Sequence, residues 1–123
     1  MFILSEELWD LRNSRFDSYY KFFENYQNQF IVPQTLDGTE TTWICFPLQI
    51  NPDTGWSRKK LQIHLEDNGI FSRVIFSGNV TRQPMLKNQE YRVHPDGLKN
   101  CDQIMEYGIM LPCHPTMTDD DCA

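Results

Sequence analysis

The chain has 123 residues, 40% of them hydrophobic and 23% charged, so it is long enough for one globular domain and does not have the composition of a disordered chain. Its formal net charge of −6 argues against non-specific binding to nucleic acid, which depends on Lys and Arg neutralising phosphates. It also has no apolar run near the roughly 18 residues that span a bilayer and no basic start typical of a signal peptide, so we expect a cytoplasmic protein without a membrane segment.

The first predicted element is a long helix from Ser5 to about Phe30, a stretch without Gly or Pro. Apolar residues recur at helical spacing along two of its faces. A helix of about 26 residues would be about 39 Å long, which is about the width of a compact domain of this size. One small domain cannot easily cover both apolar faces. We therefore expect another part of a larger protein, or a second copy of the chain in a homo-oligomer, to pack against this helix.

The middle of the chain predicts a strand, a helix and a second strand. Residues 41–50 are rich in β-forming residues, and Pro47 favours a sheet edge or a bulge for this strand. Ser57 is a candidate N-cap for the following helix, which should end at Gly69. Alternating apolar residues over 70–76 predict the second strand.

A long segment without clear periodicity, residues 77–97, separates the second strand from a short helix. Loops of this length within compact domains are usually functional or disordered. Asn100 with Gln103 resembles a capping box that opens the helix, and a short buried strand is predicted over 109–113. The order of elements predicts a single α+β domain over residues 1–123.

The last residues carry a helix start signal, because a Thr is followed by three acids over 116–121. The chain stops two residues after this signal and leaves no room for a full helix, so we expect that the polypeptide has been shortened there.

Few residues outside the long loop indicate chemistry. His64, His94 and His114 are scattered and lack metal-ligand spacing, so no metal site is predicted. The four cysteines contain no Cys-x-x-Cys pair, and free thiols are favoured over disulfides. No nucleophile elbow, P-loop or dinucleotide-binding glycine motif is present.

Basic and amide side chains gather around the long loop. Three arginines and two amides at the carboxyl end of a strand can recognise phosphate and sugar hydroxyls, because Arg offers a planar fork and amides both donate and accept. The alternative, to which the residues alone give equal weight, is a simple turn with surface arginines. The candidate substrate-binding residues are Arg73, Asn79, Arg82, Gln83, Tyr91 and Arg92.

The same stretch resembles a known family. The run Gly78-Asn79-x-Thr81-Arg82-Gln83-Pro84, preceded by Gly69-Ile70-x-Ser72-Arg73 and followed by Tyr91-Arg92-Val93 and Asn100-x-Asp102-x-Ile104-Met105, resembles the C-terminal segment of the DegT/DnrJ/EryC1/StrS sugar aminotransferases. Within this family it is most similar to the CDP-4-keto-6-deoxyglucose and GDP-4-keto-6-deoxymannose 3-dehydrases. The resemblance extends over nearly the whole chain.

The resemblance implies the small C-terminal domain of the aspartate-aminotransferase fold (fold type I of the pyridoxal-phosphate enzymes), with a long first helix and a short, mainly antiparallel sheet. It implies that Arg73, Asn79, Arg82 and Gln83 face a CDP- or GDP-4-keto-6-deoxyhexose, with Tyr91 and Arg92 supporting the loop. Pyridoxal or pyridoxamine phosphate would belong to an N-terminal cofactor domain that this chain lacks. No catalytic or cofactor-binding residue is therefore assigned here.

The expected function is that of the substrate-covering domain of a nucleotide-sugar 3-dehydrase or aminotransferase in deoxysugar and lipopolysaccharide O-antigen biosynthesis, inactive alone. The residue that separates the two reactions would lie upstream, so that choice stays open. The alternatives are a stand-alone module for sugar-nucleotide binding or oligomerisation, and a remnant without function.

Overall fold

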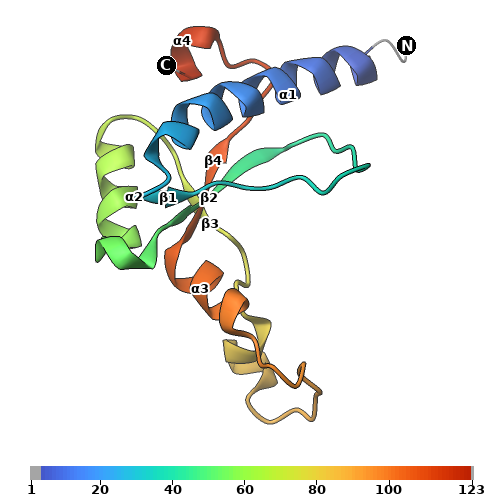
Figure 1. Cartoon of the computed structure of the whole chain (residues 1–123), viewed down its shortest axis with the longest axis vertical. Helices are drawn as coiled ribbons and strands as arrows, with labels where there is room; N and C mark the ends of the chain where they lie inside the picture. The colour runs from blue at the N-terminus through green and yellow to red at the C-terminus, as the bar shows by residue number, and fades with distance from the viewer. Residues whose placement is uncertain (1–3, 123) are drawn as a thin grey trace.

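The computed structural model describes residues 4–122 and contains a four-stranded sheet with helices packed on it (Figure 1). The strands are β1 (Phe30–Ile31), β2 (Cys45–Ile50), β3 (Arg73–Val74) and β4 (Gly108–Pro112), in the order β1-β2-β4-β3. Every neighbouring pair is antiparallel. The predicted α+β class, with a long first helix and a short antiparallel sheet, is confirmed.

The core lies on one face of the two central strands. Side chains alternate along β2, so Phe46 and Leu48 are buried while their neighbours are only partly covered. Leu111 and Ile109 of β4 lie directly opposite these two residues in the register. Because residues paired in an antiparallel sheet share a face, the four side chains form one continuous apolar surface.

The first helix, α1 (Leu4–Phe23), covers this surface. Phe16 and Tyr19 are buried, and their rings lie 5.0 Å and 5.4 Å from the ring of Phe46. Trp43, just before β2, stacks on Phe16 at 4.2 Å. Burial of several aromatic rings at one place means that the contact between α1 and β2 stabilises this small domain.

The prediction that the first helix continues to about Phe30 is wrong. α1 ends at Phe23, a 3-10 helix follows over Glu24–Tyr26, and the chain then enters β1. The backbone N–H of Asn51 donates to the carbonyl of Gln29 at 2.8 Å, beside the β1–β2 pairing. The residues after Phe23 carry no local signal that ends a helix. Their pairing with β2 therefore sets the end of α1.

Apolar side chains of α1 remain uncovered in the described part of the chain, as expected from its two apolar faces. Trp9 is 38% exposed and Phe22 is 49% exposed, and Tyr26 after the helix is 43% exposed. Figure 1 shows that the N-terminal half of α1 extends beyond the sheet, above the loop that joins β1 to β2.

The second helix, α2 (Arg58–Asp67), follows a one-turn 3-10 helix over Pro52–Thr54 and agrees with the prediction. Gly69 has φ +78° just after the helix, and the N–H of Ile70 donates to the carbonyl of Leu65 at 2.8 Å, which closes the last turn. Ser57 occupies the N-cap position, but its side chain makes no capping hydrogen bond, contrary to expectation.

Two strand predictions need correction. β2 is an interior strand of the sheet rather than an edge strand. Pro47 is tolerated there because β1 pairs only with Gln49 and Ile50, so no strand pairs with Pro47 on the β1 side. The strand predicted over 70–76 is reduced to the two exposed residues of β3. It pairs with β4 at the edge of the sheet.

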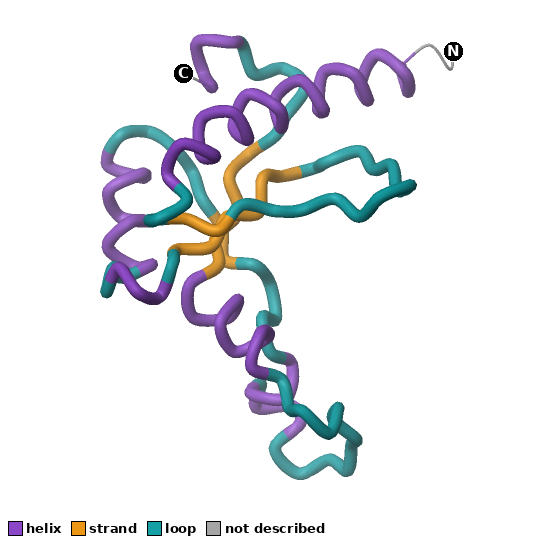
Figure 2. The backbone as a smooth tube through the Cα atoms, viewed as in Figure 1, coloured by secondary structure: helices purple, strands orange, loops and turns teal. Residues whose placement is uncertain are grey.

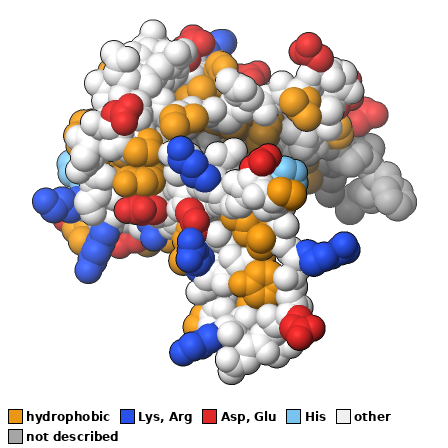
Figure 3. Space-filling model, turned by 60° about the horizontal axis from the view of Figure 1, so that its bottom comes forward, with side chains coloured by type: hydrophobic (Ala, Val, Ile, Leu, Met, Phe, Trp, Pro, Cys, Tyr) orange, Lys and Arg blue, Asp and Glu red, His pale blue; other side chains and the backbone are white. Residues whose placement is uncertain are grey.

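Residues 77–107 form an arm that projects away from the sheet (Figures 1 and 2). The arm consists of two 3-10 turns, Val80–Arg82 and Pro84–Leu86, an irregular segment, and α3 (Lys99–Tyr107). The predicted capping box is wrong, because Leu98 is the N-cap of α3 and no side chain caps it. Figure 3 shows apolar and basic side chains both exposed on this projecting part.

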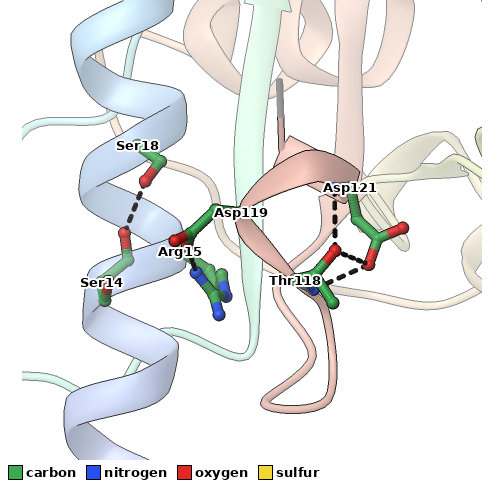
Figure 4. A network of polar contacts seen from close by, with 6 residues as sticks. All are labelled: Ser14, Arg15, Ser18, Thr118, Asp119 and Asp121. Atoms are coloured by element: carbon green, nitrogen blue, oxygen red, sulfur yellow. Dashed lines mark hydrogen bonds and ion pairs between the residues drawn. The ribbon is translucent and has the colours of Figure 1, made fainter.

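The C-terminal end of the chain lies beside α1. The Thr and acids do start a helix within the chain, the short α4 (Asp119–Cys122). The Thr118 N–H and hydroxyl both donate to Asp121, at 2.7 and 2.8 Å, and the Asp121 N–H donates to the Thr118 hydroxyl at 3.2 Å (Figure 4). Arg15 of α1 forms an ion pair with Asp119, which ties α4 to the first helix.

Two expectations about the whole chain can be compared with the described residues. All four cysteines are free thiols, as the absence of a Cys-x-x-Cys pair favours. Within residues 4–122, no helix combines the length and hydropathy required to cross a bilayer.

Candidate functional site

The six predicted site residues divide into two groups in the structure. Asn79 and Arg82 share the carboxylate of Asp102 at the base of the arm, and Gln83, in the same turn, donates separately to the carbonyl of Ser77. Arg73 lies on β3, and Tyr91 and Arg92 lie in the irregular part of the arm. The structure thus brings three of the six together and leaves the other three on the surface.

Asn79 is the buried centre of the network, with only 2% of its surface exposed. Its Nδ2 donates to the carboxylate of Asp102 at 2.7 Å. Its Oδ1 accepts from the Thr81 N–H at 3.0 Å and from the Thr81 hydroxyl at 2.6 Å, an arrangement that starts the 3-10 turn. Because a buried amide must satisfy its donors and acceptors within the protein, Asn79 fixes the shape of the turn and its contact with α3.

Arg82 binds the same carboxylate from the outer side. Its Nε and Nη2 donate to the two oxygens of Asp102, each at 3.0 Å, which is the bidentate geometry of a guanidinium–carboxylate pair. The hydrogen bonds from Arg82 and Asn79 lower the pKa of Asp102, and the same contact raises the pKa of Arg82. The two side chains are 63% and 40% exposed, so the pair contributes more to geometry than to stability.

Gln83 and two unusual backbone conformations complete the turn. The Gln83 amide donates to the carbonyl of Ser77 at 3.2 Å. Ser77 and Gly78 have φ +65° and +50°, and a Cβ at Gly78 would overlap the Cα and Cβ of Met105 on α3. Glycine is required at this position because the turn lies directly against the helix backbone.

Arg73, Tyr91 and Arg92 are exposed to solvent. Within residues 4–122, no ion pair holds either arginine. Tyr91 adds to the electrostatic environment that raises the pKa of Arg82, so it lies near the network. Arg73 and Arg92 are available cations in the described structure, whereas Arg82 already has a partner.

The sequence reasoning missed the role of Asp102 as the residue that joins the network. Asp102 is an acid in the first turn of α3 and accepts from both Asn79 and Arg82. A signal was present, because the one acid in the Asn100-x-Asp102-x-Ile104-Met105 motif is the natural partner for the arginine of the Gly78-to-Pro84 run. Sequence alone does not show that the two motifs meet.

Two open clefts lie elsewhere. A cleft of about 510 Å³ between the start of α2 and the end of α3 is lined by residues that include Trp56, Lys59 and Tyr107. A cleft of about 460 Å³ between α1 and the loop joining β1 to β2 is lined by residues that include Trp9 and Trp43. The candidate network borders neither cleft.

None of the described lysines has the environment of a lysine that forms a Schiff base with pyridoxal phosphate. A lysine that forms a Schiff base is usually desolvated so that it becomes a nucleophile near neutral pH. All five lysines here are exposed: Lys21, Lys59, Lys60, Lys87 and Lys99. In residues 4–122 there is also no cluster of three or more His, Cys, Asp or Glu suited to a metal ion. We assign no cofactor ligand to this chain.

Comparison with known proteins gives the arrangement a context. Residues 5–123 match the DegT/DnrJ/EryC1/StrS aminotransferase family. The chain is 31% identical over 114 residues to the lipopolysaccharide biosynthesis protein RfbH of Salmonella typhimurium, and the match covers 92% of this chain and 26% of that protein. It is 30% identical over 89 residues to the dTDP-4-dehydro-2,6-dideoxy-D-glucose 3-dehydratase of Saccharopolyspora spinosa, and this match covers 72% of this chain and 19% of that protein.

Solved structures agree on the fold. The chain is similar to the E. coli GDP-4-keto-6-deoxy-D-mannose-3-dehydratase with bound hydrated pyridoxal phosphate, with a TM-score of 0.83 and 24% identity over 95% of this chain and 29% of that one. An aminotransferase of this family from Brucella abortus gives a TM-score of 0.69 at 22% identity, and the match covers 90% of this chain and 28% of that one. The chain therefore spans less than a third of the length of each of these proteins.

Proposed function

The chain belongs to the DegT/DnrJ/EryC1/StrS aminotransferase family, and we propose that it is the part of a pyridoxal- or pyridoxamine-phosphate-dependent sugar enzyme that closes over a nucleotide-sugar substrate. The complete enzyme would be a 3-dehydratase or aminotransferase of deoxysugar or lipopolysaccharide biosynthesis. RfbH and the 3-dehydratase from Saccharopolyspora spinosa both carry names of this kind. One relative of the same fold is a GDP-4-keto-6-deoxymannose-3-dehydratase with bound GDP-perosamine, which supports the GDP-linked sugar within the proposed class of CDP- or GDP-4-keto-6-deoxyhexoses.

The observation that carries the proposal is a rigid turn in a stretch of chain that also carries exposed cations. The Asn79 network fixes the base of the arm, and two arginines are exposed, Arg73 on β3 before the arm and Arg92 in its irregular segment. A nucleoside diphosphate sugar carries two phosphates and several hydroxyls. Arginines suit the phosphates, and the Gln83 amide suits a hydroxyl. In this role the chain binds and orients the sugar and keeps water from it, while the cofactor supplies the bond-breaking chemistry.

Titration of the chain with GDP-mannose and CDP-glucose, followed by amide chemical shifts, tests this proposal. We expect Arg73→Ala to weaken the binding by about tenfold, the value of one charge-assisted contact. Lys99→Ala is the matched control, because it removes an exposed cation of α3 that is not assigned to the site. Equal effects of the two substitutions would show that only net charge matters and would contradict the assignment of Arg73.

The proposal includes inactivity of this chain alone. Since none of the described lysines is desolvated, added pyridoxal phosphate should give no stable Schiff-base absorbance. A stoichiometric band that disappears on substitution of a single lysine would contradict this.

An oligomerisation module is the second candidate, favoured by the uncovered Trp9, Phe22 and Tyr26 around the first helix. Size-exclusion chromatography over a range of protein concentrations tests it. A concentration-dependent dimer that Phe22→Ser abolishes would support this candidate, and a monomer at every concentration would reject it.

A further inference from the structure

The base of the arm contains one acid with a buried partner and an exposed one. Asp102 accepts from Asn79 at 2.7 Å on its inner side and from both Nε and Nη2 of Arg82 on its outer side. Asn79 is 2% exposed and cannot move without breaking the 3-10 turn that its Oδ1 holds. Asp102 therefore joins a fixed element to an exposed arginine.

The geometry of the guanidinium decides what this contact does. Arginine has five N–H donors on two usable edges, one formed by Nε and Nη2 and the other by Nη1 and Nη2. Asp102 occupies the first edge with two hydrogen bonds of 3.0 Å. Within residues 4–122 the Nη1 edge, with the second hydrogen of Nη2, has no partner, on a side chain that is 63% exposed. The carboxylate therefore does not remove Arg82 from binding, but determines which edge faces outward.

We propose that Asp102 is a positioning residue of this site: by holding the Nε edge of Arg82 against the turn centred on Asn79, it presents the Nη1 edge to an anionic group of the ligand. The identity of the anion as a diphosphate rests on the function proposed above, whereas the positioning of Arg82 does not. Arg82 and Arg73 then have different roles, since Arg82 is held in one orientation and Arg73 is free to adjust.

The ligand-independent test follows the arginine itself. In the wild-type chain the Arg82 Nε–H is hydrogen-bonded, so its NMR signal should be resolved and exchange slowly with water. Asp102→Asn keeps an oxygen for Asn79 but removes the charge and one acceptor, and should speed this exchange by at least about tenfold. Asp96→Asn is the matched control, because Asp96 is an exposed acid of the same arm that lies beside His94, at 3.4 Å, and away from Arg82 in the hydrogen bonds of the described chain. Unchanged Nε–H exchange in Asp102→Asn would overturn the proposal.

The same Asp102→Asn variant separates positioning from simple support of the fold, because its side-chain oxygen can still accept from Asn79. We expect the amide protection of residues 79–83 to stay close to the wild type while GDP-mannose affinity falls about tenfold. Wild-type affinity in Asp102→Asn would overturn the proposal, because the orientation of Arg82 would then be irrelevant to binding. If the wild-type chain does not bind GDP-mannose, the proposed function fails, and the Nε–H exchange alone still decides whether Asp102 positions Arg82.

Discussion

Gly78 is the position where one added methyl group should separate the turn at residues 77–83 from α3. It has φ +50°, and a Cβ at this residue would overlap the Cα and Cβ of Met105. Gly97, at the other end of the irregular segment, has φ +80°, and a Cβ there would meet no atom within 4 Å. The two glycines share the positive φ, and only Gly78 also has the close approach.

The expected costs follow from these two contributions. Placing Ala at a positive φ costs about 1–2 kcal/mol at either site. At Gly78 the overlap adds about 1–3 kcal/mol, as for an extra methyl group in a packed interior, because the nearest atoms include helix backbone rather than the end of a flexible side chain. Gly78→Ala should therefore cost about 2–5 kcal/mol and Gly97→Ala about 1–2 kcal/mol.

Hydrogen exchange measured by mass spectrometry locates these costs. In Gly78→Ala we expect the amides of 79–83 and the first turns of α3 to lose protection, while the amides of β2 and β4 keep theirs, because the overlap lies outside the core. Gly97→Ala should change exchange only near the substitution. Equal behaviour of the two variants would refute the close packing of the Gly78 turn on Met105.

The remaining predictions concern the body of the domain. Phe46→Ala removes a ring with 0% exposure and should lower the free energy of unfolding, measured by urea titration, by about 3–5 kcal/mol. A loss below about 1 kcal/mol would contradict the packing of this ring in the core. Thr118→Ala removes the N-cap of α4 and should cost about 1 kcal/mol while speeding amide exchange in residues 119–122. Burial raises the pKa of Tyr19 from 10.0 to about 12 and that of Cys113 from 9.0 to about 12. Because the unfolded chain releases these protons first, the free energy of unfolding should fall as pH rises from about 9 to 12, and urea midpoints that stay constant over this range would contradict the burial.

The sequence predicts the elements that are specified locally. Gly69 ends α2 through its positive φ, and the Thr and acids over 116–121 start α4, because both signals act within one turn of chain. The end of α1 is not local: residues after Phe23 leave the helix to pair with β2, some twenty residues further along the chain. The capping signal at Asn100 fails because α3 already begins at Lys99, with Leu98 as its N-cap, and its first turn contacts the Asn79 turn through Asp102.

The candidate site shows the same difference between features specified locally and features that depend on distant contacts. Residue types and the family motifs identified the stretch that contains Asn79, Arg82 and Gln83, and the structure joins Asn79 and Arg82 through Asp102 while Gln83 bonds to Ser77 within the same turn. What the sequence could not show is that Asn79 is buried and that its amide is used within the protein. That result depends on α3 lying beside the turn, a contact between residues more than twenty positions apart. The assignment of all six residues to a substrate stays a prediction.

The arrangement of the two central strands has a consequence for how the protein can evolve. β2 and β4 pair directly, so residues 51–107, with α2 and the whole arm, form a loop closed by the centre of the sheet. The entropy of closing such a loop grows only with the logarithm of its length, about 0.6 kcal/mol for each doubling. Insertions or deletions of a few residues near the tip of the arm therefore cost the sheet almost nothing. The length and sequence of the arm can therefore change while the packing of the core stays the same.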